Sequence, residues 1–379
     1  MLGVSAVMFS LLVSCTDLIN LSHGLDDPYE GMKPTLVRAG EGQESEINTV
    51  DLSLSLQSPQ MGVLWGIDWV SEWQYSWNES EPGYGVLGYS APGLMKSTIY
   101  SVDRNTKKRY TPFYKIFDPD GGRVSLSTGY VYDILLYSYG TEYTLFSQSD
   151  DNETYTASTH INDYFTSQSE GSETDSYVDY YMPNELLGSM ISSMDLSGKP
   201  SGYDKEIALD GTVTYVKPMS VTLKPFSFIY LMQIVVLKNA DYSGNRIIGV
   251  KDVTVTGLAQ GVDLFTGKTM DNTISITTDD IKPLQNHNNV RLDDETTVDN
   301  ADILAARILT WGLPGIVPLE STKAGTKVPV LDNNYIDITL MLRNGKTQSV
   351  SIDITEQMHN KPTGGVITVV IDANYVSLK

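Results

Sequence analysis

The sequence predicts an all-β protein with two antiparallel β-sandwich domains. Apolar and polar residues alternate with a period of two in many short segments from about residue 50 onward, and turn residues separate these segments. Helical periodicity is scarce. The chain of 379 residues exceeds the usual size of one hydrophobic core, so we expect a first domain over 46–185 and a second over 186–379.

The chain begins with an apolar run that ends at its only cysteine. Residues 1–14 are uncharged and shorter than the ~20 residues that a spanning helix needs, which is typical of a signal peptide. The segment Leu12-Val13-Ser14-Cys15 resembles the lipobox of bacterial lipoproteins. This resemblance implies cleavage before Cys15 and a diacylglyceryl group on its thiol, which would hold the chain on an outer membrane. The alternatives are a chance cysteine after an ordinary signal peptide, or a buried one.

Residues 15–45 have the composition of a flexible, lipidated tether. Proline, glycine and acidic residues are frequent and aromatic residues are few, so this stretch cannot bury a core of its own. Arg38 would be accessible to a trypsin-like protease, and the alternative is a plain linker arginine.

The clearest strands lie near the C-terminus. Apolar residues alternate with polar ones from Ile336 to Leu342 and again from Val350 to Ile354, on either side of Asn344-Gly345. This pair favours a type I′ turn, in which both central residues have positive φ, so a hairpin with one buried face is expected. Further strands are predicted at Leu52–Leu56, Ile99–Val102, Arg123–Leu126, Tyr130–Tyr137, Tyr143–Phe146, Val213–Val216, Ser220–Leu223, Phe228–Leu237, Lys251–Thr256, Thr273–Thr277 and Val366–Ile371.

Three segments are less regular. Asn184–Met194 has the spacing of a short helix near the domain junction. Ala301–Thr310 has helical composition but reads better as a strand. Ser167–Asp179 is rich in serine and acidic residues and is expected to be an exposed loop.

Composition excludes several functions. The formal net charge of −21 disfavours nucleic acid as a partner, because phosphate binding needs clustered lysine and arginine. No metal-ligand pair, nucleophile elbow or phosphate-binding glycine loop occurs, so neither an enzyme nor a metal site is expected. Asp118-Pro119-Asp120 lacks the later ligands of a calcium loop and is expected to be a turn.

Aromatic residues gather between residues 65 and 89. Trp65, Trp69, Trp73 and Trp77 recur at a spacing of four, which keeps side chains near one face of a strand or helix. One interpretation is a contact surface at Trp73, Tyr75 and Trp77 that stacks on sugar rings. The other is that these side chains belong to a core. The 23 tyrosines of the chain also hint at a contact surface.

Several stretches together resemble the fimbrillin-like lipoproteins of Bacteroidales, the subunits of type V pili, and most of all their anchor and accessory branch. The stretches are the lipobox at Cys15, Ile67-Asp68-Trp69 with Pro92-Gly93-Leu94-Met95, the segment 121–137, and the segment 255–264 with Leu309-Thr310-Trp311-Gly312. The resemblance implies two tandem transthyretin-like β-sandwiches and a non-catalytic role in pilus assembly and cell adhesion. It also implies that other pilus subunits bind by β-strand addition. A glycan-binding surface lipoprotein, or a stalk or tip pilin cut after Arg38, are the alternatives.

Overall fold

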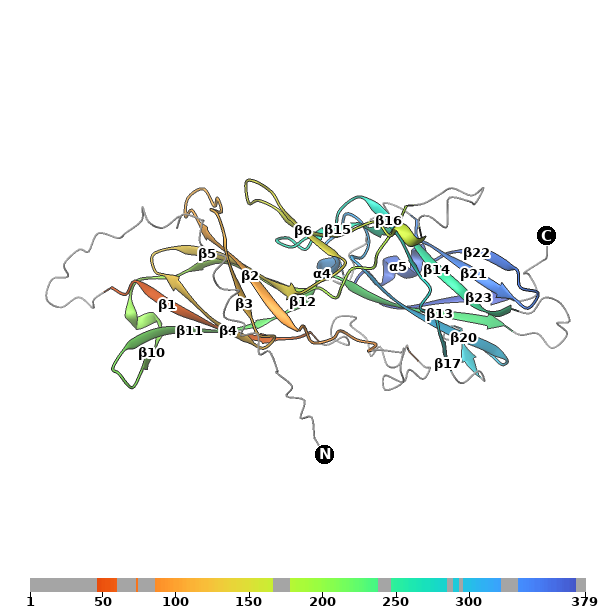
Figure 1. Ribbon diagram of the computed structural model, residues 1–379, viewed down its shortest axis with the longest axis horizontal. Helices are drawn as coiled ribbons and strands as arrows, with labels where there is room; N and C mark the ends of the chain where they lie inside the picture. Colours follow the sequence, from red (N-terminus) through yellow and green to blue (C-terminus); the bar gives the residue numbers. More distant parts are fainter. Residues whose placement is uncertain are drawn as a thin grey trace, which may run out of the picture. The chain divides into compact units, whose positions relative to one another are not determined.

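The computed structural model describes residues 46–59, 73, 86–165, 178–237, 247–284, 289–292, 296–321 and 333–372. These residues form two β-sandwiches, which confirms the all-β prediction (Figure 1). Cys15, Arg38, Tyr75 and Trp77 lie outside the described residues. So does most of the expected loop over 167–179.

The first sandwich pairs a four-stranded sheet with a five-stranded sheet. The four-stranded sheet has the order β10 (Asp204–Ile207), β11 (Val213–Thr222), β1 (Thr49–Gln57), β4 (Gly121–Ser127). The five-stranded sheet has the order β12 (Lys224–Pro225), β9 (Leu187–Asp195), β5 (Val131–Tyr139), β2 (Leu94–Val102), β3 (Phe113–Phe117). Alternate residues of these strands, such as Leu52, Ile99 and Ile134, are fully buried between the sheets.

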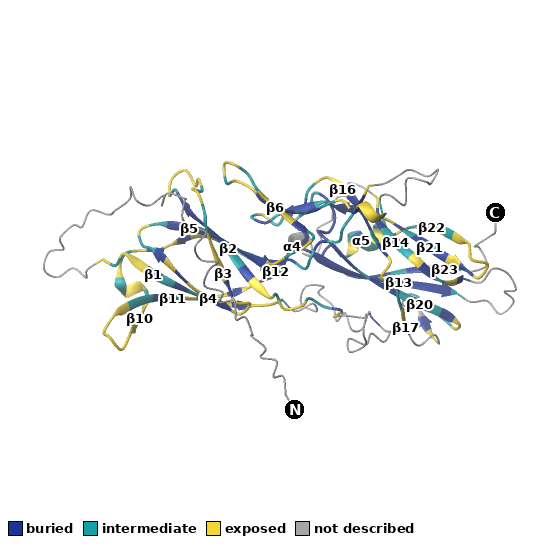
Figure 2. Ribbon diagram, in the orientation of Figure 1, coloured by how far each residue is buried: buried dark blue, intermediate teal, exposed yellow. Residues whose placement is uncertain are grey.

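The second sandwich is built in the same way. One sheet has the order β17 (Lys282–Leu284), β20 (Ala301–Thr310), β13 (Phe228–Leu237), β23 (Gly365–Asp372). The other has the order β22 (Thr347–Asp353), β21 (Tyr335–Leu342), β14 (Ile247–Ala259), β16 (Thr273–Thr278), β8 (Asp179–Tyr180). β13 is buried on both faces, which Figure 2 shows as a nearly continuous dark strand. Its sequence is correspondingly an apolar run in which Gln233 is the only polar amide residue.

A small three-stranded sheet joins chain segments from both halves. It has the order β15 (Gly261–Asp263), β7 (Tyr155–Thr159), β6 (Thr144–Gln148). Shorter elements are β18 (Val290–Arg291), β19 (Thr297–Val298), the 3-10 turn η2 (Pro200–Gly202), and the helices α4 (Pro318–Ser321) and α5 (Thr355–Asn360). Most strand pairs are antiparallel, but β1 pairs with β11, β13 with β23 and β16 with β8 in parallel.

Three local predictions need correction. The expected helix at Asn184–Met194 is wrong, because β9 occupies this segment and pairs with β5. The Asn344-Gly345 hairpin is confirmed, but only Gly345 has positive φ, and its N–H bonds to the Leu342 carbonyl. The turn is therefore not type I′. The expected domain change at 185/186 falls inside the first sandwich, because β9, β10, β11 and β12 all belong to it.

Two other predictions are confirmed. Ala301–Thr310 is the strand β20, which pairs along its whole length with β13. Asp118 to Gly121 form a turn in which the Gly121 N–H donates to the Asp118 carbonyl, and Gly121 has a φ of 125°. A side chain on Gly121 would meet the Leu54 carbonyl at 2.0 Å, so glycine is required there.

Candidate functional site

Trp73 is the one residue of the predicted aromatic surface that the structure describes, and it is buried. Its side chain is 6% exposed. It packs with Leu87 against Ile229 and Leu231 of β13, on the face of that strand turned away from the sandwich core. The segment between β1 and β2 therefore supplies core residues to the second sandwich, and Trp73 does not present a surface to a ligand.

Arg307 of β20 binds the segment between β1 and β2 through hydrogen bonds. Its guanidinium donates to the carbonyls of Leu87 at 3.2 Å and Gly88 at 3.0 Å, and it forms an ion pair with Glu185. The other Glu185 oxygen accepts from the Ser90 N–H at 2.6 Å. Because both charged side chains are only about a fifth exposed, at 18% and 20%, this pair is well shielded from solvent.

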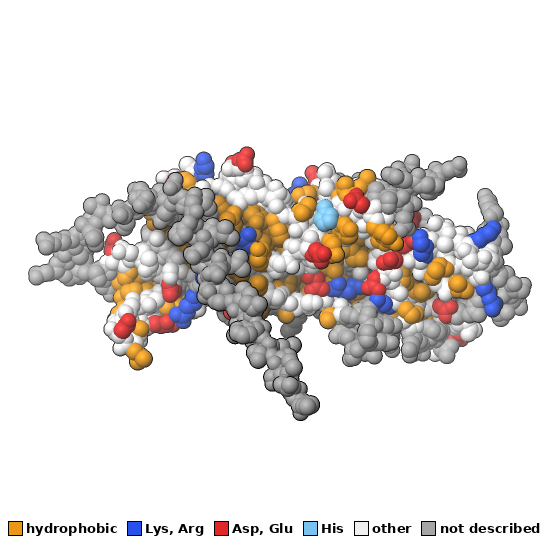
Figure 3. Space-filling model, viewed as in Figure 1, with side chains coloured by type: hydrophobic (Ala, Val, Ile, Leu, Met, Phe, Trp, Pro, Cys, Tyr) orange, Lys and Arg blue, Asp and Glu red, His pale blue; other side chains and the backbone are white. Residues whose placement is uncertain are grey.

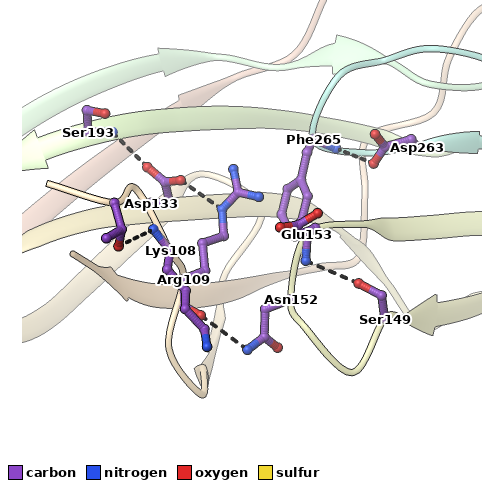
Figure 4. A network of polar contacts seen from close by, with 10 residues as sticks. Lys108, Arg109, Asp133, Ser149, Asn152, Glu153, Ser193, Asp263 and Phe265 are labelled. Carbon is purple, nitrogen blue, oxygen red and sulfur yellow. Dashed lines mark hydrogen bonds and ion pairs between the residues drawn. The ribbon is translucent and has the colours of Figure 1, made fainter. Parts of the chain in front are cut away.

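A second polar network lies where the chain segment after β15 meets the first sandwich (Figure 4). Asp133 of β5 is 6% exposed and accepts from Arg109 Nε at 2.8 Å and from the Ser193 N–H at 2.7 Å. The Arg109 guanidinium lies over the ring of Phe265, 3.9 Å from its centroid. Asp133 thus holds a β-bulge in β9 and, through Arg109, a contact between the two sandwiches.

An apolar core lies between the sandwiches. It contains Trp311, Tyr137, Tyr155, Leu135 and Leu264, among others. The hydroxyl groups of Tyr137 and Tyr155 are 2.7 Å apart and share a hydrogen bond. Burial raises the pKa of the Tyr137 hydroxyl far above its usual range, so this hydroxyl stays neutral.

β9 presents an unpaired strand edge. β12 pairs only with Leu187 and Gly188, so from Ser189 to Asp195 no described strand lies on the side of β9 away from β5. Leu187 directs its backbone N–H and C=O to the Ser138 hydroxyl on β5. By the alternation of a strand, Gly188 and Met190 direct theirs outward. A cavity of about 170 Å³ adjoins this edge and is lined by Met190, Phe226 and Phe265, among others.

Several other sheet edges are closed by side chains or are poor templates. The side-chain amide of Gln357 on α5 makes both hydrogen bonds to the backbone of Thr368 on β23, at 2.9 and 3.0 Å. Lys361 donates to the Val366 carbonyl of the same strand at 2.6 Å. β17 is three residues long and contains Pro283, and β10 is short and charged. Such edges resist the addition of another strand.

An exposed aromatic surface lies on the outer face of the five-stranded sheet of the first sandwich. We call it the tyrosine face and define it by Leu94, Lys96, Tyr114, Ile116 and Tyr139. Residues directly opposite in an antiparallel pair share a face, and here Lys96 lies opposite Ile116, and Leu94 opposite Tyr139. Tyr114 is 51% exposed and Tyr139 is 43% exposed. Figure 3 shows hydrophobic side chains gathered over this sandwich.

Lys96 stands at the centre of the tyrosine face. Its Nζ lies 4.5 Å from the ring centroid of Tyr114, 5.4 Å from that of Tyr139 and 6.0 Å from that of Tyr137. Desolvation lowers the pKa of this ammonium group. The tyrosine count pointed to a contact surface, but only the register of β2, β3 and β5 brings these rings around one lysine.

The described residues carry no metal site and no membrane-spanning helix. Within them, no group of three His, Cys, Asp or Glu side chains is arranged to hold a metal ion. No helix in these parts of the chain has the length and apolar character needed to cross a membrane.

The chain is similar in structure to several solved proteins. A candidate adhesin from Bacteroides ovatus aligns with 91% of this chain and 100% of its own, at 14% identity and a TM-score of 0.47. The fimbrial anchor protein Mfa2 from Porphyromonas gingivalis aligns over 84% and 90%, at 9% identity and a TM-score of 0.39. A fimbrial assembly protein from Parabacteroides distasonis aligns over 86% and 93%, at 10% identity and a TM-score of 0.30.

These structural neighbours are Bacteroidales adhesins and fimbrial anchor or assembly proteins, the class that the sequence resembles. No protein-family model and no curated protein sequence matches the chain.

Proposed function

We propose that this protein is a non-catalytic anchor or accessory subunit of a fimbrium, held on the outer membrane by a lipid on Cys15. The lipobox pattern supports the anchor, because the only cysteine of the chain follows an apolar run and the small residue Ser14. Two or more acyl chains hold a protein stably on a membrane, whereas one chain does not.

The observation that carries the assembly role is the unpaired edge of β9. A strand added beside Met190 would find outward-directed backbone groups and, next to them, the cavity near Phe226. Backbone hydrogen bonds would supply affinity and the cavity would select one side chain. The bulge at Ser193, held by Asp133, limits this pairing to the first half of β9.

The anchor is tested by fractionating cells that express the full chain or its Cys15→Ala variant. We expect the wild type in the membrane fraction, labelled by a radioactive fatty acid, and the variant in the soluble fraction without label. A variant that stays in the membrane fraction would contradict lipid anchoring at this position.

Strand addition is tested with Met190→Pro and Met190→Ala in the full chain. Proline removes the outward N–H without changing the pairing of Ile191 with β5, and alanine keeps that N–H. We expect cross-linked fimbrial subunits to be lost with Met190→Pro and retained with Met190→Ala. Equal cross-linking of both variants would exclude this edge as the docking strand.

A further inference from the structure

We propose that the tyrosine face binds carboxylated sugar residues, such as uronic or sialic acids, of a glycan. This binding activity goes beyond the assembly role and does not depend on it. The site consists of Lys96 between the rings of Tyr114 and Tyr139, with the apolar side chains of Leu94 and Ile116 at its borders.

The aromatic part of the site suits a sugar ring. Tyr114 and Tyr139 each leave about half of their side chain open to solvent, at 51% and 43%. A pyranose ring has an apolar C–H face and polar hydroxyl edges, and a tyrosine likewise offers an apolar ring with a polar tip. The rings stand on strands paired within one sheet, so they are positioned before a ligand arrives.

The charge of Lys96 selects an anionic ligand. Among the described residues, no carboxylate lies within 4.0 Å of its Nζ, and its neighbours are tyrosine rings. A carboxylate placed there would form a charge-assisted hydrogen bond in a partly desolvated setting. The chain as a whole carries a net charge of −21, so its overall field repels polyanions and the attraction must come from this local site.

The backbone around Lys96 disfavours a peptide as the ligand. β2 is paired with β3 on one side and β5 on the other, and β5 is paired with β2 and β9. A peptide strand therefore cannot pair with the strands that carry Lys96 and Tyr139. Among the described strands that carry this face, only β3 has an outer edge open to a further strand, so recognition at Lys96 and Tyr139 uses side chains, through ring stacking and one charge.

The test measures binding of the full chain in detergent by isothermal titration calorimetry. The probes are a glucuronate-containing oligosaccharide, its methyl-esterified form and poly-L-glutamate. The ester keeps the sugar rings and removes the carboxylate charge, while poly-L-glutamate keeps carboxylates without sugar rings. We expect binding of the free oligosaccharide, and at least about tenfold weaker binding of both other probes.

The variants assign the binding to this face. We expect Lys96→Met to weaken oligosaccharide binding at least about tenfold, Tyr114→Leu and Tyr139→Leu to weaken it, and Lys96→Arg to retain it. Lys115→Met is the control, because Lys115 is exposed on the same edge strand but lies opposite Ser97, on the other face. The proposal is overturned by no binding, by equal binding of the ester or of poly-L-glutamate, or by an unchanged affinity of Lys96→Met.

Discussion

The buried carboxylate of Asp133 offers a direct test of how the fold is held together. The change is Asp133→Asn, which keeps the shape of the side chain and removes its charge. The asparagine oxygen can still accept from the Ser193 N–H, but its NH₂ group then faces Arg109 Nε, so two donors meet where a donor and an acceptor met before.

The expected loss in the free energy of unfolding follows from the burial of the Arg109–Asp133 pair. A hydrogen bond to a charged group contributes about 1.5–3 kcal/mol, and breaking a buried ion pair from one side costs about 3–5 kcal/mol. The Arg109 and Asp133 side chains are 21% and 8% exposed, so solvent cannot replace the lost partner fully. We expect Asp133→Asn to lower the free energy of unfolding by about 3 kcal/mol.

Urea unfolding of the full chain, followed by tryptophan fluorescence, measures this loss. The matched control is Asp195→Asn, because the Asp195–Arg104 pair is also close, at 2.6 Å, but its side chains are 53% and 51% exposed. The control should cost no more than about 1 kcal/mol. If both variants lose the same stability, burial is not what makes the Asp133 pair strong, and the reasoning fails.

Three further predictions concern stability. Trp73→Ala should lower the free energy of unfolding by about 3–5 kcal/mol in urea, because the ring is buried, and a negligible loss would mean that the ring is a surface group. Gly257→Ala should lower the melting temperature more than Gly345→Ala does: both glycines have positive φ, but a Cβ at 257 would lie 2.5 Å from the Asn333 carbonyl, whereas 345 is open. Equal losses would contradict this. Burial raises the pKa of Asp179 to about 7, whereas an aspartate of the unfolded chain has a pKa of about 4. The contribution of this carboxyl group to folding stability is therefore fully present below about pH 4 and is lost as the pH rises through 7. Asp179→Asn should therefore raise the melting temperature, relative to wild type, more at about pH 8 than at about pH 5, and a constant difference would refute the assignment.

The alternation of apolar and polar residues predicted strands correctly where one strand face is buried and the other is exposed to solvent. It located the hairpin of β21 and β22, and the segment Phe228–Leu237, also predicted as a strand, is β13. The helix prediction for the segment of β9 was wrong for a physical reason. Leu187, Met190, Ile191 and Met194 have helical spacing, and the bulge after Ile191 breaks the period of two that a regular strand would show. Pairing with β5 overrides the local pattern.

The candidate sites were largely hidden in the sequence. Trp73 was one of four equally spaced tryptophans, and only the contact with β13 shows that it belongs to a core. Lys96, Tyr114 and Tyr139 lie far apart in the sequence, and strand register, which depends on turns and partners, brings them together. Lipidation at Cys15 and cleavage at Arg38 stay predictions, because both residues lie outside the described part of the chain.

The parallel strand pairs have a consequence for how the protein is made. β1 lies inside its sheet, yet its parallel partner β11 begins only at Val213. In the same way, β13 pairs in parallel with β23, which ends at Asp372. Contacts between such distant segments form late, because long loops must close first. We expect the nascent chain to remain open until the ribosome has nearly finished it, a state in which a secretion channel can still thread it.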